Sequence, residues 1–465
     1  ISFIIPNFKK AREMAQAVRA ISPKSKIILG GHGVNIPDIE SMIEHDFICR
    51  GEGVYYLREL FKENLHKPIK HPLGYSSFNR QVMGAPWASD SGILITGVGC
   101  ANKCRFCATT HFFGTYVPYL KTGKEIFDLC CRYEKEMHVT DFGVLDENFL
   151  KMKDRALELL DLMEKNQRRF TFAIFSSAET LKEIGDLDIL VRLGVTFIWV
   201  GVESKNGRYA KNRNTDFQVL FSELKKRGIS VLASSILFNE DHDKNTIWED
   251  VDYVTSLKPD YVQFAPLGPI PGTRLYEDYE KQGKVIHDVP YESQHGQGKI
   301  WFRHDHFSRE ESEDFLRLAF EIDYNRNGAS MLRGMRTTLN GYAYCRNHPE
   351  EAVRVRAEGF RKRLTIMRYF LTASTLFVQN RQSEILLREI KKSFRSELGR
   401  TKALGLALSL LVVCYSLKEY LRCRLVGDAR RPKTSYRPLN RQSRTGAKAA
   451  ISPELAVRPA KAVCG

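Results

Sequence analysis

The chain lacks the features that mark secreted and membrane-spanning proteins. It does not begin with the basic start, apolar core and small-residue cleavage site of a signal peptide. Its most apolar stretch, Ala403–Leu417, covers 15 residues, whereas about 20 are needed to cross a bilayer. Such a stretch is typical of a buried helix or, as the alternative, of an interfacial helix on a membrane. We therefore expect a cytoplasmic protein, with membrane association left open.

The sequence also lacks the cysteine pattern of a disulfide-bonded framework. Ten cysteines are spread over 465 residues, and only Cys100, Cys104 and Cys107 form a cluster. Small secreted proteins instead carry an even disulfide framework, so this usage indicates a reducing compartment and a metal centre. No Cys or His pair at zinc-finger spacing lies nearby, although His111 keeps a zinc site open as an alternative.

Negative charge is scarce at the C-terminal end. The chain has a formal net charge of +16, and residues 422–465 contain eleven Lys and Arg against Asp428 and Glu454. Such a run is typical of a solvated tail, and the alternative is attraction to an anionic membrane or to nucleic acid. Because no RNA-binding module or RNP-type aromatic motif is present, nucleic acid is the less favoured partner.

Six strand patterns alternate with amphipathic helix patterns between Ser91 and about Glu280. The predicted strands are Ile93–Thr96, Asp141–Leu145, Phe170–Phe175, Thr196–Gly201, Ser230–Phe238 and Tyr261–Pro266. Six βα units predict a partial (β/α)6 barrel over residues 91–285, with its reactive end at the carboxyl edge of the strands. In the first predicted helix, apolar residues at helical spacing place Cys130 in the core.

An α/β pattern also precedes this barrel. Residues 1–65 predict part of a Rossmann-like domain, with a helix at Phe8–Ala20 and strands at Ile1–Ile5, Ile27–Leu29 and Phe47–Cys49. Residues 66–90, with scattered Pro, Gly, Ser and Asn, predict a linker. Because the chain opens inside a strand pattern, we expect it to be a fragment of a longer protein.

The pattern after the barrel is helical. Residues 286–425 predict a helical C-terminal region, in which Ser308 and Glu311 form a capping-box signature and further helices cover 351–378 and 381–397. Residues 426–465 lack periodicity and predict a basic, disordered tail.

The cysteine cluster follows the first predicted barrel strand and the turn Gly97–Gly99. Its spacing is C-x3-C-x2-C, from Cys100 through Cys104 to Cys107. Thiolates this close on one loop can converge on a soft metal centre. An iron–sulfur cluster of four irons held by three cysteines has one iron open to a substrate or cofactor, as a reaction requires.

This spacing, its place after the first strand, and the aromatic Phe106 before the last cysteine resemble the radical S-adenosylmethionine (SAM) signature CxxxCxΦC. The resemblance implies that Cys100, Cys104 and Cys107 hold a 4Fe–4S cluster and that Phe106 packs beside it. It further implies that SAM binds the open iron and is cleaved to a 5′-deoxyadenosyl radical.

Other strand ends resemble the same superfamily. Gly201–Ser204 resembles the GxES segment, which implies that Glu203, with Ser204 beside it, contacts SAM through the ribose. Asp146 begins a segment similar to one found after the second strand in the cobalamin-associated branch. Ser177 would reach the methionyl part of SAM. Phe238–Asp243 departs from the family, since a Gly-rich turn is common there, and leaves the adenine contact undefined.

A loop after the sixth strand and two N-terminal turns extend the resemblance to class B enzymes, which carry a cobalamin-binding domain before the barrel. Pro271 and Gly272 lie in a PxPGT-like loop and would line the substrate side. The turns resemble GGPH and RGEGE segments, which implies that Gly30, Gly31 and Gly33 approach cobalamin. The family's DxHxxG loop, whose His ligates cobalt, would lie before residue 1, and His32 is not that ligand.

The resemblance implies a cobalamin-dependent C-methyltransferase that acts on an unactivated carbon of a small molecule or of a lipid such as an isoprenoid. A reducing donor such as flavodoxin or ferredoxin would serve it. The alternatives are a non-methylating radical SAM cyclase or carbon–carbon coupling enzyme, an RNA-modifying radical SAM enzyme, and a binding module with a structural metal.

Overall fold

A computed structural model describes residues 1–76, 91–205, 212, 214–399 and 403–427. The predicted linker falls partly outside these residues, and the predicted basic tail falls almost entirely outside them.

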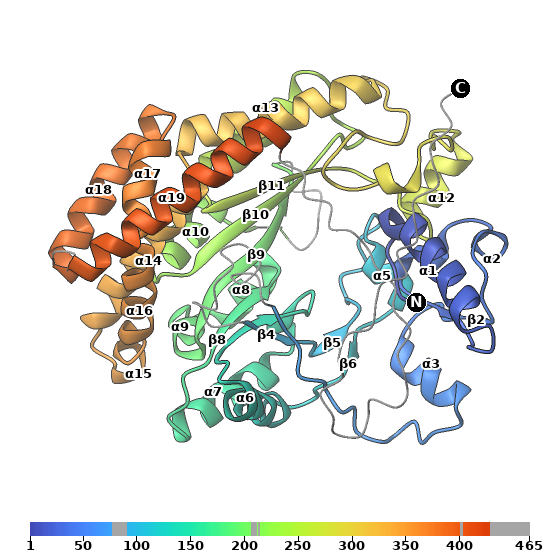
Figure 1. Cartoon of the computed structure of the whole chain (residues 1–465), viewed down its shortest axis with the longest axis horizontal. Helices are drawn as coiled ribbons and strands as arrows, with labels where there is room; N and C mark the ends of the chain where they lie inside the picture. The colour runs from blue at the N-terminus through green and yellow to red at the C-terminus, as the bar shows by residue number, and fades with distance from the viewer. Residues whose placement is uncertain (77–90, 206–211, 213, 400–402, 428–465) are drawn as a thin grey trace.

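A seven-stranded sheet forms the centre of the molecule (Figure 1). Its strand order is β11-β10-β9-β8-β7-β4-β3, and the first six strands in this order are mutually parallel. At one edge of the sheet, β3 (Tyr75–Ser76) pairs antiparallel with β4. The six parallel strands are β4 (Ser91–Leu94), β7 (Asp141–Val144), β8 (Thr171–Phe175), β9 (Val195–Glu203), β10 (Ser230–Leu237) and β11 (Tyr261–Pro266).

These six strands follow one another in space as they do in the chain. The predicted α/β alternation is therefore confirmed, and each predicted strand lies within about two residues of an observed one. Parallel neighbours require crossover connections, which are usually helical. The helices between the strands are α5 (Ala108–Phe113), α6 (Gly123–Met137), α7 (Lys153–Lys165), α8 (Ala178–Ile184), α9 (Asp188–Leu193), α10 (Phe217–Lys226) and α11 (Thr246–Ser256).

Helix α6 shows how local sequence fixes these connections. A capping box between Thr122 and Glu125 starts the helix by satisfying its first N–H groups. Cys130 is fully buried on the face that meets the sheet, as its helical spacing predicts. Beside it the buried Tyr133 donates its hydroxyl to the carbonyls of Gly74 and Ile93 and so holds β3 and β4 together.

A small antiparallel ribbon closes the loop that holds the cysteine cluster. β5 (Gly97–Val98) pairs with β6 (Val117–Pro118), so residues 99–116 form a bounded excursion at the end of β4. Gly99 has φ +86°, and a Cβ there would lie 2.0 Å from the carbonyl oxygen of Thr115. Only glycine fits this close backbone approach.

The N-terminal unit contains fewer strands than its pattern predicts. Ile1–Ile5 is not a strand: it makes one parallel bridge, between Ser2 and Gly30, and then enters the 3-10 turn η1 (Ile5–Asn7). The cause is Pro6, whose fixed φ suits the first turn of a helix better than a strand. The remaining elements are α1 (Phe8–Ile21), β1 (Ile28–Leu29), η2 (His32–Asn35), α2 (Ile39–Met42), β2 (Phe47–Ile48) and α3 (Gly53–Leu60).

The C-terminal region is helical, and the Ser308–Glu311 capping box is confirmed at the start of the helix Arg309–Asn327. The predicted helix 351–378 is divided into three, and the break at Arg356 lets this buried guanidinium reach the carbonyls of Phe170 and Arg192. The elements are α12 (Arg274–Lys281), η5 (Tyr291–Ser293), α13 (Arg309–Asn327), α14 (Ser330–Arg346), α15 (Glu351–Arg354), α16 (Ala357–Met367), α17 (Phe370–Phe377), α18 (Arg381–Leu398) and α19 (Ala403–Val426).

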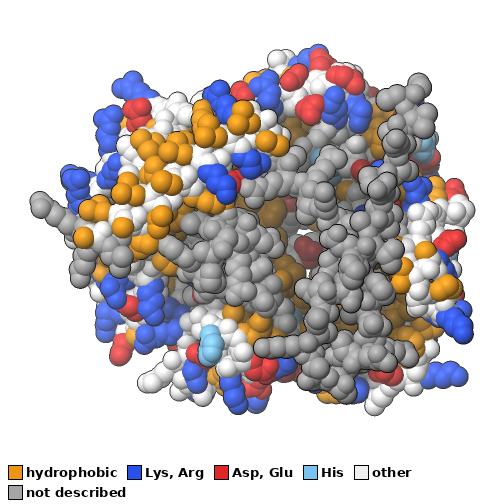
Figure 2. All heavy atoms as spheres, viewed as in Figure 1, with side chains coloured by type: hydrophobic (Ala, Val, Ile, Leu, Met, Phe, Trp, Pro, Cys, Tyr) orange, Lys and Arg blue, Asp and Glu red, His pale blue; other side chains and the backbone are white. Residues whose placement is uncertain are grey.

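Helix α19 is longer than its predicted apolar stretch and continues for 24 residues. It is not wholly buried, because several of its leucines lie on the surface (Figure 2). No helix among the described residues is both long and apolar enough to cross a membrane.

Candidate functional site

The carboxyl ends of the parallel strands bring the predicted site residues to one edge of the sheet. The cysteine loop follows β4, Asp146 follows β7, Ser177 follows β8, Glu203 ends β9 and Pro271 follows β11. Open α/β sheets and (β/α) barrels place their ligands at this edge. The N-terminal unit lies beyond the same edge and packs against it (Figure 1).

The cysteine loop carries three partly exposed thiols within eight residues. Cys100, Cys104 and Cys107 form no disulfide, and a turn closed by the Cys107 N–H and the Cys104 carbonyl links the last two. Lys103 adopts φ +49°, so the chain reverses within the cluster. Partly exposed thiols that form no disulfide, carried on one tight loop, are a donor set suited to a soft metal or an iron–sulfur cluster.

Within the described part of the chain, no three His, Cys, Asp or Glu side chains already meet at the separation that a metal ion needs. The assignment of Cys100, Cys104 and Cys107 as cluster ligands stays a prediction from their spacing. Phe106, between the last two, packs against the main hydrophobic core rather than into solvent.

Arg105 anchors this loop to the opposite side of the sheet edge, and the sequence pattern does not reveal it. Its guanidinium pairs with Glu240 at 2.9 Å and with Asp278 at 3.0 Å. Its backbone carbonyl accepts the Leu275 N–H at 3.2 Å. The loop between the two outer cysteines is therefore tied to the loop after β10 and to α12. Only the charge of Arg105 hints at this function, since nothing in the motif spacing singles it out.

Asp146 is almost fully buried and is engaged by donors from the protein itself. Its Oδ2 atom accepts the hydroxyls of Thr96 and Tyr116, each at 2.6 Å, and lies 2.9 Å from Nη2 of Arg155. Burial, and then the neighbouring carboxylate, raise the pKa of Tyr116 to about 12, so this phenol stays a neutral donor. In this structure Asp146 joins β7 to the ribbon below the cysteine loop.

Ser177 is likewise tied to the preceding strand end. Its backbone N–H donates to Oδ1 of Asn148 at 3.1 Å, and its hydroxyl accepts from Nδ2 of the same residue at 3.1 Å. It also caps α8 through the Thr180 N–H. Sequence reasoning missed Asn148, although it lies in the segment that suggested Asp146. The observed partners give Ser177 a positioning task, and its contact with SAM stays a prediction.

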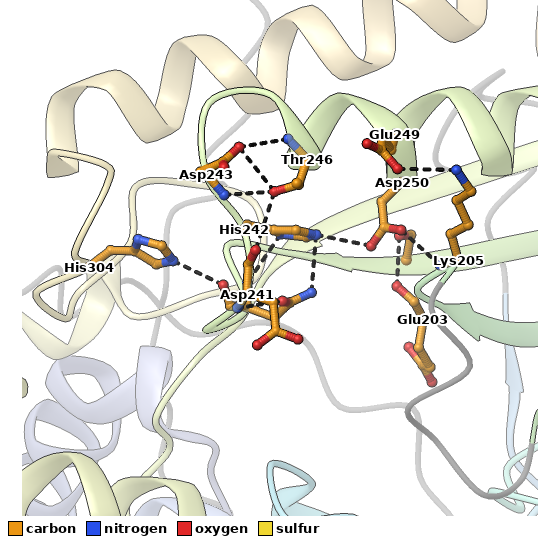
Figure 3. A network of polar contacts seen from close by, with 11 residues as sticks. Glu203, Lys205, Asp241, His242, Asp243, Thr246, Glu249, Asp250 and His304 are labelled. Carbon is orange, nitrogen blue, oxygen red and sulfur yellow. Dashed lines mark hydrogen bonds and ion pairs between the residues drawn. The ribbon is translucent and has the colours of Figure 1, made fainter.

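Glu203 occupies a strained position at the end of β9. The register between β9 and β10 shifts near Glu203, and its φ is +63°. Bulges of this kind re-aim a side chain and are frequent beside active sites. Its carbonyl accepts the hydroxyl of the buried Ser235 at 2.9 Å, and Figure 3 shows its carboxylate directed away from His242 and Asp250. The backbone thus turns this carboxylate toward the sheet edge, and Ser204 beside it is also buried.

A buried network after β10 supports the backbone next to Glu203 (Figure 3). Asp250 accepts the Lys205 N–H at 2.8 Å through one oxygen and lies 3.0 Å from Nε2 of His242 through the other. The Asn239 N–H lies 3.3 Å from the other ring nitrogen of His242. Asn239 and His242 belong to the segment that departs from the family pattern, and Asp250 lies on the helix that follows it, so the resemblance could not assign them. They fix the Glu203–Lys205 turn.

The PxPGT-like loop contacts the N-terminal unit. Gly272 has φ +86°, and a Cβ there would lie 2.3 Å from Nδ2 of Asn35. Ile270 packs against the hydrophobic cluster of the N-terminal unit. Thr273 caps α12 by accepting the Tyr276 N–H. Gly272 is required by close packing between two parts of the chain, and the substrate contact of Pro271 stays a prediction.

The glycine turn of the N-terminal unit is shaped by the chain's own Phe3. A Cβ on Gly33 would lie 2.2 Å from the Phe3 ring, and one on Gly31 would lie 2.6 Å from the Phe3 carbonyl oxygen. A Cβ on Gly30 would meet Cys49 at an ordinary 3.7 Å. The space beside Gly31 and Gly33 is therefore filled by protein, which explains both glycines. Their approach to cobalamin stays a prediction.

The junction between the N-terminal unit and the cysteine loop is aromatic. The ring of His32 lies 4.8 Å from that of Phe112 and 5.8 Å from that of Phe113, both on the helix that follows Cys107. Burial lowers the pKa of His32, which favours the neutral ring. Among the described residues, Nε2 of His32 and Nε2 of His111 are buried without a hydrogen-bond partner. Such orphaned polar atoms are rare and call for a missing partner.

Comparison with known proteins points to methyltransferases. No family model matches the chain. It is 27% identical to bacteriochlorophyllide d C-8(2)-methyltransferase of Chlorobaculum tepidum, over 56% of this chain and 63% of that protein. It is 23% identical to an uncharacterised methyltransferase of Pyrococcus horikoshii, over 57% of this chain and 66% of that protein. The chain thus matches slightly less than two-thirds of the length of each.

A solved structure of the radical SAM methyltransferase TsrM from Kitasatospora setae aligns with 77% of this chain and 84% of its own at 16% identity, with a TM-score of 0.48. The cysteine signature on the loop after β4 resembles that of radical SAM enzymes, and the chain is similar to these methyltransferases over more than half of its length. A 4Fe–4S cluster and SAM are the cofactors that this resemblance implies.

Proposed function

We propose that this chain catalyses a cobalamin-dependent radical methylation of an unactivated carbon. The observation that carries the proposal is the contact between the N-terminal unit and α5, the helix that begins directly after Cys107. A second cofactor held by the N-terminal unit would lie next to the cysteine loop. The similarity to curated methyltransferases supports a methyl transfer at this junction.

The residues at the sheet edge would have separate functions. A bound 4Fe–4S cluster would supply the electron that cleaves SAM, and cobalamin would supply the methyl group. Cys100, Cys104 and Cys107 would hold the cluster. Glu203, re-aimed by its bulge and held by Asp250 through the neighbouring turn, would orient the SAM ribose. Arg105 would keep the cysteine loop in place through its two carboxylate partners.

Support for cobalamin comes from the junction rather than from the glycine turn. Phe3 already occupies the space beside Gly31 and Gly33. The imidazoles of His32 and His111, in contrast, each have a buried Nε2 atom that lacks a hydrogen-bond partner among the described residues. A polar group of a bound cofactor at this junction would satisfy them, as would ordered water.

The substrate we propose is a small molecule or a lipid such as an isoprenoid, and the electron donor a small acidic carrier such as flavodoxin or ferredoxin. The exposed Lys103 within the cysteine loop, and the partial exposure of the three thiols, would let such a carrier approach the cluster.

The proposal is tested by anaerobic reconstitution with iron, sulfide and hydroxocobalamin, followed by incubation with methyl-deuterated SAM and dithionite. Because reduced cobalamin would take the methyl group from SAM, mass spectrometry should find S-adenosylhomocysteine and deuterated methylcobalamin together with 5′-deoxyadenosine, and the visible spectrum should show cobalamin retained after desalting. Release of 5′-deoxyadenosine alone, from protein that retains no cobalamin, would overturn methyl transfer in favour of a non-methylating radical enzyme.

A further inference from the structure

Helix α19 carries a continuous apolar stripe on its exposed side. Leucines three, four or seven residues apart lie on one face of an α-helix. Along α19 these positions are 44–82% exposed rather than buried, and the stripe consists of Leu406, Leu410, Leu411, Leu417, Leu421 and Leu425. At 1.5 Å per residue, the 24 residues of the helix extend about 36 Å. Figure 2 shows these side chains as a band of apolar atoms across the molecule.

The opposite side of α19 holds the helix on the protein. Val412 and Ser409 are buried there, and Phe377 of α17 lies 5.7 Å from Tyr420, ring to ring. The helix is thus docked along its length, with the stripe turned outward. Monomeric proteins rarely leave an apolar patch of this extent in water, so the stripe indicates an interaction surface.

The charges next to the stripe are basic. Within the described residues, α19 carries Lys418, Arg422 and Arg424 against Glu419 alone, and Glu419 pairs with Arg422 at 2.8 Å. The sequence then continues with nine further Lys and Arg up to residue 465. An apolar stripe flanked by cations complements a lipid bilayer, in which an anionic headgroup layer covers an apolar interior.

We propose that α19 lies in the headgroup region of an anionic membrane, with its leucine stripe inserted and its basic end against the lipid phosphates. The basic charges beside the stripe favour a membrane over a second copy of this chain, because a second copy would present the same cations whereas lipid phosphates are anionic.

The test is sedimentation of the full chain with vesicles of phosphatidylcholine alone and with vesicles that also contain about 30% phosphatidylglycerol, whose phosphates make the surface anionic. We expect binding to the anionic vesicles that weakens as salt is raised. Leu410→Glu with Leu421→Glu should reduce it at least tenfold. The matched control is Val219→Glu with Ile366→Glu, which adds the same charge at exposed apolar positions of α10 and α16 and should bind as the parent does.

Absence of binding to anionic vesicles, or equal loss in both double variants, would overturn the proposal. So would sedimentation equilibrium that shows a dimer dissolved by the stripe variant, with no vesicle binding, because a second copy would then cover the stripe. Circular dichroism of each variant checks that α19 still forms. The assay needs neither the cluster nor SAM, so its outcome is independent of the methylation proposal.

Discussion

The glycine turn after β1 and the cysteine loop after β4 both carry short motifs, yet the fold uses them differently. The glycines of the first are accounted for by contacts inside the protein, since Phe3 fills the space beside Gly31 and Gly33. The thiols of the second are partly exposed, form no disulfide and are tied down mainly through Arg105. A motif that packing explains gives weak evidence for a ligand, whereas half-exposed thiols on one anchored loop give stronger evidence.

The largest effect on stability should come from the buried ion pair below the cysteine loop. Arg155→Met leaves the Asp146 carboxylate, 1% exposed, without its cation, and breaking such a pair costs about 3–5 kcal/mol. Urea denaturation of the metal-free protein measures this loss. Arg168→Met, which removes a surface pair with Glu134, should cost under about 1 kcal/mol. Equal costs would show that Asp146 does not brace this edge.

Gly33→Ala should have the next largest effect, because its Cβ would lie 2.2 Å from the Phe3 ring. Overpacking of this kind costs about 1–3 kcal/mol, to be read from the same urea transitions. In a Phe3→Ala background, where the ring is absent, Gly33→Ala should cost less than it does in the parent chain. Gly53→Ala, where no atom lies within 4 Å of the new Cβ, serves as the control. If Gly33→Ala proved neutral, the glycine would be free for a ligand, and the contrast with the cysteine loop would fail.

Asp250→Ala should act on SAM rather than mainly on folding. The Lys205 N–H loses its acceptor, so the turn that follows Glu203 loosens, and we expect SAM to bind the reconstituted protein about tenfold more weakly, or about 1.4 kcal/mol. Isothermal titration measures the affinity. Glu249→Ala removes only the exposed partner of the Lys205 side chain and should leave SAM affinity unchanged. An unchanged affinity in Asp250→Ala would remove this network from the site.

The smallest effect on stability should follow replacement of Cys100, Cys104 and Cys107 by alanine in metal-free protein. Since the thiols are partly exposed and form no disulfide, we expect a change within about 0.5 kcal/mol. Urea denaturation checks this value. A loss several times larger would mean that the loop, like the glycine turn, serves the fold first.

Much of the sheet could be predicted because its strands and helices have clear periods. β10 alternates buried and partly buried residues along its whole length, and α6 combines a capping box with a buried stripe. The strand prediction for Ile1–Ile5 was wrong, because its apolar run is typical of a strand whereas Pro6 places the chain in a 3-10 turn. The apolar stretch also did not predict where α19 ends. The helix continues beyond Leu417, through the charged Lys418 and Glu419, to Val426.

The candidate site was predictable only where its residues form a motif. The spacing of Cys100, Cys104 and Cys107 by itself indicates a metal or iron–sulfur centre, because it can be recognised without knowing how the rest of the chain folds. Contacts between segments far apart carry no such signal, and Arg105 with Glu240 joins residues 135 positions apart. The pairing of Gly272 with Asn35 depends in the same way on how the N-terminal unit docks.

The most direct test of the central claim is electron paramagnetic resonance of the anaerobically reconstituted, dithionite-reduced chain, with and without SAM. We predict a 4Fe–4S signal that changes when SAM is added and is lost in Cys104→Ala. Cys131→Ala, which removes a partly exposed thiol on α6 that forms no disulfide, should retain the signal. A colourless protein, or a signal that Cys104→Ala leaves intact, would contradict the account.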